Sequence, residues 1–430
     1  MKKFMALLLT VVLCMSLFGC GASSGTSSQS EDTTKTEEKT QEATAEETKE
    51  TTEEPTKLTL ILRGGAYSDV IQALLPEFEK ENNVKCEVMD LAFADLHDKI
   101  ALDAANPNGA YDLIMVDGSW IPEFIEYDVA MNLSAEGYAL DDDFIAEAAV
   151  AGYNKDNDLF CVPFFGNVNV LLYNDALLES VGAAVPETWT DVLDTAKKVK
   201  AAGAEGFLAR AQAGDNITTD FLPVLLAHGG HILDANNQPT INTPEFKDAL
   251  EMYIELKDAG TIMDKDDIIA AISGEKAAMS LSWPGWYVPE EGGPAHYTVL
   301  PTKVDDASPV NPSSIYGVWF VGVAANSQNK EMTLKLLDYL TNAENQLLAI
   351  DFGGVPTRHS PYQDASVIAT YPHFEIVYNA LQNGVYRPLV TEWNDITIAL
   401  GNELEAAVQG VKTVDQALAD AQSAVEQIMN

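Results

Sequence analysis

The chain has 430 residues, of which 66 are acidic and 25 are basic, and its formal net charge is −41. This charge disfavours nucleic acid or another polyanion as a partner, because phosphate binding depends on lysine and arginine. It does not identify a ligand, since net charge affects solubility more than it defines a site. The length allows two lobes or domains.

The first 19 residues predict a signal peptide. Two lysines precede an apolar run over residues 4–18, which is too short to cross a membrane as a helix. The segment Leu17-Phe18-Gly19-Cys20 resembles a bacterial lipobox, in which the cysteine accepts diacylglycerol, although Phe18 is bulkier than the residue usual there. We therefore expect a lipid on Cys20 that anchors the protein to the outer face of the cell membrane. The alternative is an ordinary signal peptide with a chance cysteine.

The lipobox is followed by a low-complexity stretch. Residues 21–56 are almost entirely Ser, Thr, Glu, Lys, Gln, Gly and Ala. They offer little apolar surface to bury, so folding could not offset the entropy lost on ordering them. We expect residues 20–56 to form the lipidated cysteine and a disordered acidic tether.

The sequence contains four cysteines, of which Cys14 leaves with the signal peptide. If Cys20 carries the lipid, only Cys86 and Cys161 remain, each in a stretch that resembles a strand. A disulfide between them and two buried free thiols are both open at this point.

Beyond residue 57, predicted strands and helices alternate, which indicates an α/β architecture. A buried strand over residues 58–62 leads to Gly64-Gly65 and then to an amphipathic helix, which the side chain of Ser68 or Asp69 could cap. Further strands are predicted at residues 111–116, 160–165 and 168–173.

Helices with clear end signals dominate the second half. Thr188 with Asp191 predicts a capping box, and Gly203 a helix end. Thr243-Pro244 predicts another helix start, with proline at the tolerated first position. Strands are expected at residues 277–283, 297–300 and 319–325, and helices at 332–340 and within 399–429.

Four segments, taken in order, resemble a known family. They are Tyr111 to Asp117, Val162 to Asn174, Gly274 to Trp286, and Val299-Leu300-Pro301-Thr302 continued by Asn326 to Glu331. These segments are similar to the extracellular solute-binding proteins of ATP-driven importers, in the carbohydrate group that includes maltose-binding protein. The resemblance covers nearly all of residues 57–430.

The resemblance implies a two-lobed fold of the periplasmic-binding-protein type, with hinge crossings and an interlobe cleft. The first lobe would hold residues 57–165 and 302–356, and the second lobe residues 166–301 and 357–430. Such proteins close on a small solute by a hinge motion and deliver it to permease subunits of the importer. We expect a monomer.

Sugar binding requires flat aromatic surfaces for C–H faces and polar groups for hydroxyls. Asp117 could accept hydroxyl hydrogens of a ligand, or it could cap a helix. Trp283 and Trp286 are so close in sequence that we do not expect both to stack on the ligand. Asn167 stands where a maltose-binding relative has an acidic contact, so maltose specificity is not inferred from the resemblance. The predicted ligand-binding residues are Arg63, Ala66, Tyr67, Asp117, Ser119, Phe165, Asn167, Trp283, Trp286, Trp319, Arg358 and Trp393.

Arginine is rare in this chain, because only four of the 25 basic residues are arginine. A guanidinium group can grip vicinal hydroxyls or a carboxylate with two bonds, but it can also serve an ordinary salt bridge. We hypothesise that at least one of Arg63, Arg358 and Arg387 faces the cleft.

The function predicted from the sequence is binding of a sugar, a polyol or a short oligosaccharide. The alternatives are a charged solute, such as a sugar acid or a polyamine, or an enzyme that acts on surface polysaccharide, for which no nucleophile, metal or cofactor motif stands out. His228 and His231 lack further ligands for a metal, and the acidic runs 141–143 and 264–267 lack the pattern of a calcium loop. We expect no cofactor and no metal.

Overall fold

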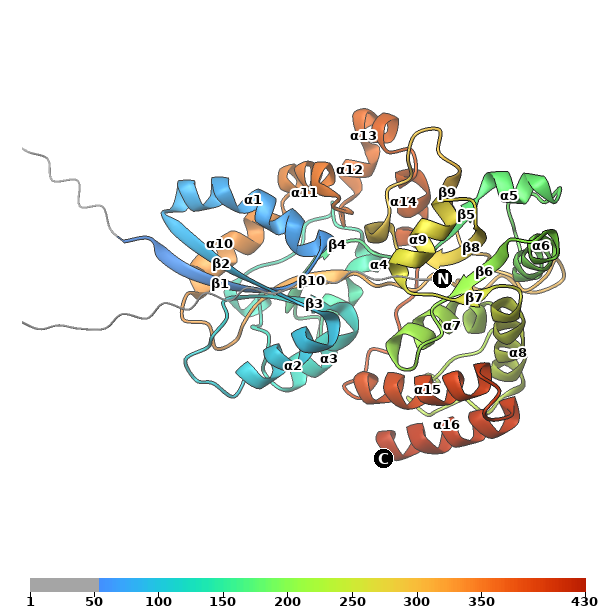
Figure 1. Ribbon diagram of the computed structural model, residues 1–430. Coiled ribbons are helices and arrows are strands. Elements are labelled where there is room, and N and C mark those ends of the chain that lie inside the picture. Colours follow the sequence, from blue (N-terminus) through green and yellow to red (C-terminus); the bar gives the residue numbers. More distant parts are fainter. Residues whose placement is uncertain (1–53) are drawn as a thin grey trace, which may run out of the picture. The chain divides into compact units, whose positions relative to one another are not determined.

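The structure is a computed structural model that describes residues 54–430 (Figure 1), apart from the side chain of Ala94. The predicted signal peptide, the lipidated Cys20 and the tether up to residue 53 lie outside the described residues. The described part contains two five-stranded sheets, each flanked by helices. The predicted two-lobed α/β fold is confirmed, and we call the parts built on these sheets the first and the second lobe.

The first sheet has the order β2-β1-β3-β10-β4. The neighbours of β1 run parallel to it, whereas β10 runs antiparallel to both β3 and β4. Every residue of β3, β4 and β10 is buried, including those of the outer strand β4, so both faces of this part of the sheet are covered. The strands are β1 (Thr56–Arg63), β2 (Val84–Leu91), β3 (Leu113–Asp117), β4 (Cys161–Phe165) and β10 (Trp319–Val323).

The second sheet has the order β7-β6-β8-β5-β9. Strand β6 is parallel to β7 and β8, and β5 is antiparallel to β8 and β9. Neighbouring residues of β5 enter different cores, Leu171 on one face and Leu172 on the other, because side chains alternate along a strand. The strands are β5 (Val170–Asn174), β6 (Glu205–Ala209), β7 (Thr261–Ile262), β8 (Ala277–Ser282) and β9 (Ala295–Thr298).

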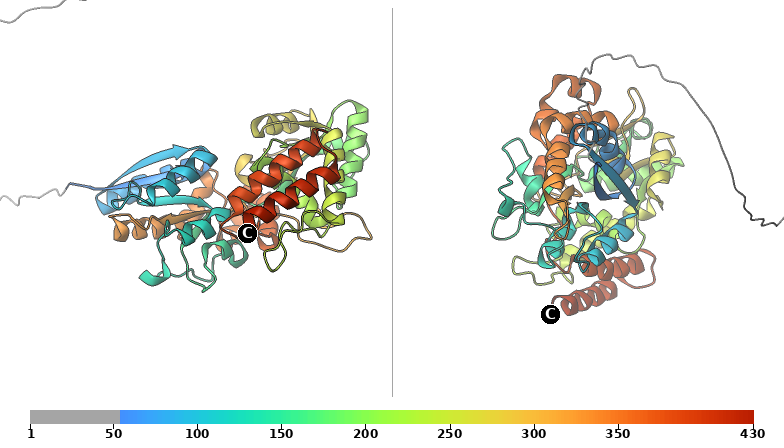
Figure 2. Two further views of the ribbon diagram at one scale, coloured as in Figure 1. Left: turned by 90° about the horizontal axis from the view of Figure 1, so that it is seen from below. Right: turned by 90° about the vertical axis from the view of Figure 1, so that its left-hand side faces the viewer.

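Helices cover the faces of both sheets, and none of those in residues 54–430 is long and apolar enough to cross a membrane. The first lobe contains α1 (Ala66–Asn82), α2 (Phe93–Asp103), α3 (Ile121–Glu126), α4 (Ala146–Ala149), α10 (Lys330–Thr341) and α11 (Ala343–Ala349). The second lobe contains α5 (Asp175–Ser180), α6 (Trp189–Ala202), α7 (Asp215–Ala227), α8 (Pro244–Asp258), α9 (Lys265–Ser273), α15 (Trp393–Val408) and α16 (Val414–Met429). The last two helices lie side by side (Figures 1 and 2).

The chain passes between the lobes three times, at residues 166–169, 299–318 and 384–392. Single β-bridges join these crossings to one another, Val168 to Tyr316 and Ile315 to Val385. The crossings therefore form one connected strip, at the place where a hinge motion of the lobes would bend the chain.

The expected lobe boundaries are wrong for residues 357–383. We assigned them to the second lobe, but α12 (His359–Gln363) packs against α11, and α14 (Phe374–Asn383) packs against α4, with α13 (Ala365–Thr370) beside α12. Ion pairs of Arg358 hold the start of α12 on the first lobe. The third crossing therefore follows α14, and the chain returns to the second lobe only at α15 and α16.

Helix ends follow the sequence signals at most predicted positions. Thr188 and Asp191 form the predicted capping box of α6, and Thr243 caps α8. The expected cap of α1 by Ser68 or Asp69 is wrong, because this helix begins earlier, after Gly65. Gly65 has φ of 86°, a conformation that glycine adopts without strain, and this turn brings the helix start close to the end of β1.

Cys86 and Cys161 are buried free thiols. They lie on β2 and β4, the two outer strands of the first sheet, which places them four strand spacings or roughly 19 Å apart. A disulfide requires Cα atoms within about 7 Å, so this pair cannot form one. Burial also raises the pKa of both thiols to about 12, which suppresses the reactive thiolate.

We therefore expect iodoacetamide to leave Cys86 and Cys161 unmodified in the native protein and to alkylate both in denaturant without prior reduction. Mass spectrometry of the two peptides would measure this. Alkylation in denaturant only after a reducing agent has been added would contradict the assignment.

Candidate ligand-binding site

A cavity of about 510 Å³ lies where the strand ends of both lobes meet. Arg63 ends β1, Asp117 ends β3, Arg210 follows β6 and Trp283 follows β8. Ligands of α/β proteins commonly bind beyond the carboxyl ends of the strands, where the connecting loops leave a crevice. The lining residues are Arg63, Tyr67, Ala92, Phe93, Asp117, Asn167, Arg210, Ala213, Asp215, Asn216, Thr219, Trp283, Trp286, Gly317, Trp319 and Arg387.

The first-lobe wall of the cavity is aromatic. The ring centroid of Trp319 lies 5.4 Å from that of Tyr67 and 6.0 Å from that of Phe93. Trp120 supports this group from behind, with its ring centroid 5.6 Å from that of Trp319. Burial raises the pKa of the Tyr67 phenol, so this group remains a neutral hydroxyl.

Asn167, on the first crossing, connects the two walls. Its side-chain N–H donates to the Tyr67 hydroxyl at 2.9 Å, and its side-chain oxygen accepts from the backbone N–H of Gly285 at 3.1 Å. The amide is therefore fixed in one orientation between α1 and the turn after β8. An acid in the same place could not donate to Tyr67.

The second-lobe wall contains Trp286, which is only partly buried, and Trp283, which is buried. Trp283 packs on the second crossing, where a Cβ on Gly317 would lie 2.4 Å from its ring. The guanidinium carbon of Arg210 lies 4.7 Å from the ring centroid of Trp286. Trp283 is thus mainly a packing residue, and Trp286 is the accessible aromatic surface of this wall.

Arg210 is itself held by buried polar groups. Its Nε donates to Asp220 Oδ1 at 3.0 Å, its Nη2 also forms an ion pair with that oxygen, and its backbone N–H donates to Asp220 Oδ2 at 3.0 Å. Asn216 Oδ1 accepts from Nη1 at 3.2 Å, and Thr219 Oγ1 accepts from Nη2 at 3.1 Å. The loop after β6 and helix α7 therefore fix the guanidinium group that lies against Trp286.

Arg387, on the third crossing, pairs with one acid from each lobe. Its Nη2 lies 2.6 Å from Asp117 Oδ1 of the first lobe, and its Nη1 lies 3.3 Å from Asp215 Oδ1 of the second. Asp117 also accepts the hydroxyl of Ser119 at 2.7 Å. Burial raises the pKa of the Asp215 carboxyl, and the charge of Arg387 acts in the opposite direction.

Arg63 differs from the other arginines of the cavity. It forms no ion pair with any acidic group in residues 54–430, and its Nη1 makes only long hydrogen bonds, to the carbonyl oxygens of Gly64 and Leu91 at 3.3 and 3.4 Å. Its guanidinium carbon lies 5.9 Å from the ring centroid of Tyr67.

Seven of the twelve predicted binding residues line the cavity: Arg63, Tyr67, Asp117, Asn167, Trp283, Trp286 and Trp319. Ala66, Ser119 and Phe165 lie beside it without lining it. Ser119 is buried and bonded to Asp117, and Phe165 packs in the core with its ring centroid 4.7 Å from that of Tyr67. Ala66 is the first residue of α1.

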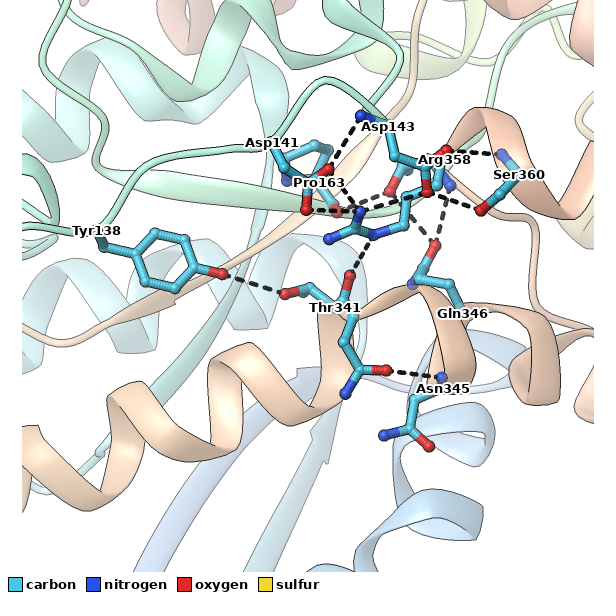
Figure 3. A network of polar contacts seen from close by, with 11 residues as sticks. Tyr138, Asp141, Asp143, Pro163, Thr341, Asn345, Gln346, Arg358 and Ser360 are labelled. Carbon is cyan, nitrogen blue, oxygen red and sulfur yellow. Dashed lines mark hydrogen bonds and ion pairs between the residues drawn. The ribbon is translucent and has the colours of Figure 1, made fainter.

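The expectation that Arg358 faces the cleft is wrong. Its Nη1 lies 2.8 Å from Asp141 and 3.4 Å from Asp143, and its Nε donates to the carbonyl oxygen of Thr341 (Figure 3). Its guanidinium carbon lies 3.8 Å from the ring centroid of Phe144. Arg358 is therefore a structural residue of the first lobe, and it pairs with two of the three acids in the run 141–143.

The expectation for Trp393 is also wrong. This residue begins α15 and is 2% exposed within the hydrophobic core of the second lobe. Helix α15 turns this first residue towards the core of the second lobe.

The sequence reasoning missed most of the second-lobe wall. It proposed no role in binding for Arg210 or Asp215, and it left out Phe93 at the start of α2. A signal for this wall was present at Gly214-Asp215, in the loop after β6. A glycine stands there directly before a helix, as Gly65 does before α1. In residues 54–430 no group of three or more His, Cys, Asp or Glu side chains is placed to hold a metal ion.

Comparison with known proteins agrees with this arrangement. The model of the bacterial extracellular solute-binding protein family matches residues 73–376. A probable amino-acid ABC transporter periplasmic-binding protein of Sinorhizobium fredii is 25% identical over 396 residues, covering 87% of this chain and 89% of that protein. The mannitol-binding protein of Pseudomonas aeruginosa is 24% identical over 381 residues, covering 78% and 84% respectively.

Among solved structures, maltose-bound MalE3 of T. maritima has the same fold. It superposes with a TM-score of 0.78 at 22% sequence identity, and the match covers 86% of this chain and 99% of that one. The family match spans every strand of both sheets except β1. The chain therefore belongs to the bacterial extracellular solute-binding protein family.

Proposed function

We propose that this chain is the solute-binding component of an ABC importer and that it captures a sugar, a polyol or a short oligosaccharide without chemical change. One observation carries the proposal: a single cavity combines the accessible ring of Trp286 with the polar groups of Asp117, Asp215 and Arg387 from both lobes. A sugar presents C–H faces to the former and hydroxyl groups to the latter. The cavity arginines disfavour a polyamine, because two cations would then meet in a partly enclosed space.

The relatives support this choice of solute class. A mannitol-binding protein is among the sequence relatives, and a maltose-bound protein shares the fold. The relative named as an amino-acid binder also handles a small polar solute, so the family likeness alone does not select the sugar. The aromatic surface of Trp286 and the surplus of hydroxyl-binding groups favour it.

Uptake would proceed by closure of the lobes about the three crossings, with the closed form recognised by the permease. The solute shifts the open–closed balance only as far as it binds the closed form more tightly. A lipid on Cys20 would keep the protein at the outer face of the membrane, and the acidic tether would let it reach the permease.

Isothermal titration calorimetry against hexoses, polyols, disaccharides and sugar acids would test the proposal. We expect at least one solute to bind at about micromolar Kd, roughly −8 kcal/mol, with no product detected by chromatography after prolonged incubation. Turnover of the solute would contradict the binding role, and silence across the whole panel would contradict the choice of solute class.

Replacing Trp286 by alanine should weaken binding of the solute about 10- to 100-fold, because the stacking surface is lost while the fold is kept. The matched control is Tyr127→Ala, which removes an exposed aromatic side chain that does not line the cavity. Calorimetry on both variants measures the effect. Equal affinities for the two variants would exclude Trp286 as the platform.

A further inference from the structure

The four arginines of the chain differ in how their charge is balanced. Three of them form ion pairs with acids: Arg210 with Asp220, Arg358 with Asp141 and Asp143, and Arg387 with Asp117 and Asp215. Arg63 pairs with no acid in the part of the chain that the structure describes. In a chain with 66 acidic residues, an unpaired arginine in a cavity wall is unusual.

The location of Arg63 favours a negatively charged partner from outside the chain. It ends β1 and lines the cavity, beside the start of the 17-residue helix α1, which has no side-chain cap. The positive end of the helix dipole adds to the potential of the guanidinium group. A neutral solute that covered Arg63 would remove water from the guanidinium group and would bring no negative charge to compensate for the lost hydration.

None of the acids that the structure describes in or beside the cavity pairs with Arg63. Asp117 and Asp215 flank Arg387, and Asp220 holds Arg210. The cavity thus contains one arginine without an acidic partner in residues 54–430, together with two acids that can accept hydroxyl hydrogens.

We propose that the solute is a sugar acid, whose carboxylate is bound by the guanidinium fork of Arg63 while its hydroxyls face Asp117, Asp215 and Arg387. This inference rests on the proposed role in solute capture and adds an acid group to the polyhydroxylated solute proposed there. A carboxylate matches a single guanidinium group in charge and in the spacing of its two oxygens. A phosphate dianion would need a second free cation, but the other two arginines that line the cavity, Arg210 and Arg387, are already paired with acids.

Paired titrations would test the inference. D-Glucuronate would be compared with D-glucose, D-galacturonate with D-galactose, and D-gluconate with D-sorbitol, by calorimetry at fixed pH and salt, with glucose 6-phosphate and a set of amino acids as further arms. We expect one acid to bind about 10- to 100-fold more tightly than its neutral partner, the range of a charge-assisted hydrogen-bond pair.

Variants of Arg63 would then locate the effect. Arg63→Gln should abolish the preference for the acid over its neutral partner, and Arg63→Lys should retain part of it, because the charge remains without the fork. The control Lys57→Gln removes one positive charge from an exposed position of the same strand and should keep the full preference. Circular dichroism would show that all three variants fold.

The outcomes separate this inference from the proposed function. A neutral sugar or polyol that binds as tightly as its acid would overturn the inference and leave the proposed function intact. The inference would likewise fail if Arg63→Gln kept the full preference or if the phosphate ester bound best. Binding of amino acids alone would overturn both.

Discussion

Replacing Arg387 by glutamine should lower the free energy of unfolding by about 3–5 kcal/mol and abolish measurable solute binding. The guanidinium group lies between Asp117 and Asp215, at 2.6 and 3.3 Å, and only 3% of its side-chain surface is exposed. Without it, Asp117 and Asp215, which come from different lobes, lose the cation that lies between them. The repulsion would oppose the lobe closure that holds the solute.

Urea denaturation followed by circular dichroism would measure the stability, and calorimetry the affinity. Arg387→Lys should lose less, because an ammonium group restores the charge but reaches the two acids less well. The control Lys247→Gln removes a cation from an exposed pair with Asp415 and should change the stability by less than about 1 kcal/mol. An Arg387→Gln protein with the parent's stability and affinity would show that this group does not join the lobes.

Replacing Asp220 by asparagine should cost about 3–5 kcal/mol of stability, because it leaves the buried charge of Arg210 without its acid. Asp220 is fully buried and accepts the side chain and the backbone N–H of Arg210. Since Arg210 lies against Trp286, the released guanidinium group should also let the ring move, so we expect a loss of solute affinity of at least about tenfold.

A double-mutant cycle distinguishes positioning of Trp286 from a general loss of stability. In the Trp286→Ala background, Asp220→Asn should still destabilise the protein but should reduce the affinity far less than in the parent. Asp415→Asn, the same chemical change at an exposed ion pair, is the control. An undiminished effect on affinity in the Trp286→Ala background would mean that Asp220 does not act through Trp286.

The sequence predicted the elements where hydrophobic pattern and end signals agreed. The structure has a helix after the predicted capping box at Thr188 and another after Thr243-Pro244. It also has strands β1, β3 and β8 where the hydrophobic pattern predicted strands. Because ligands of such folds lie at strand ends, this was enough to find the first-lobe side of the cavity.

The rest depended on contacts between segments distant in the chain. Arg358 and Arg387 are equivalent as sequence signals, each on a loop in the last quarter of the chain, but only the latter meets acids at the cavity. Trp393 and Trp286 could likewise be separated only by the packing of α15 into the second-lobe core. Asp220 lies ten residues beyond Arg210, and its role follows from the return of helix α7 past the end of β6.

A crystal structure of the protein with its tightest-binding solute would test most directly whether this cavity is the binding site. We predict one solute molecule between Trp286 and the aromatic first-lobe wall, with hydroxyl groups bonded to Asp117 or Asp215 and a carboxylate on Arg63. A solute bound elsewhere on the protein, with Trp286 and the cavity arginines untouched, would contradict the assignment of the site.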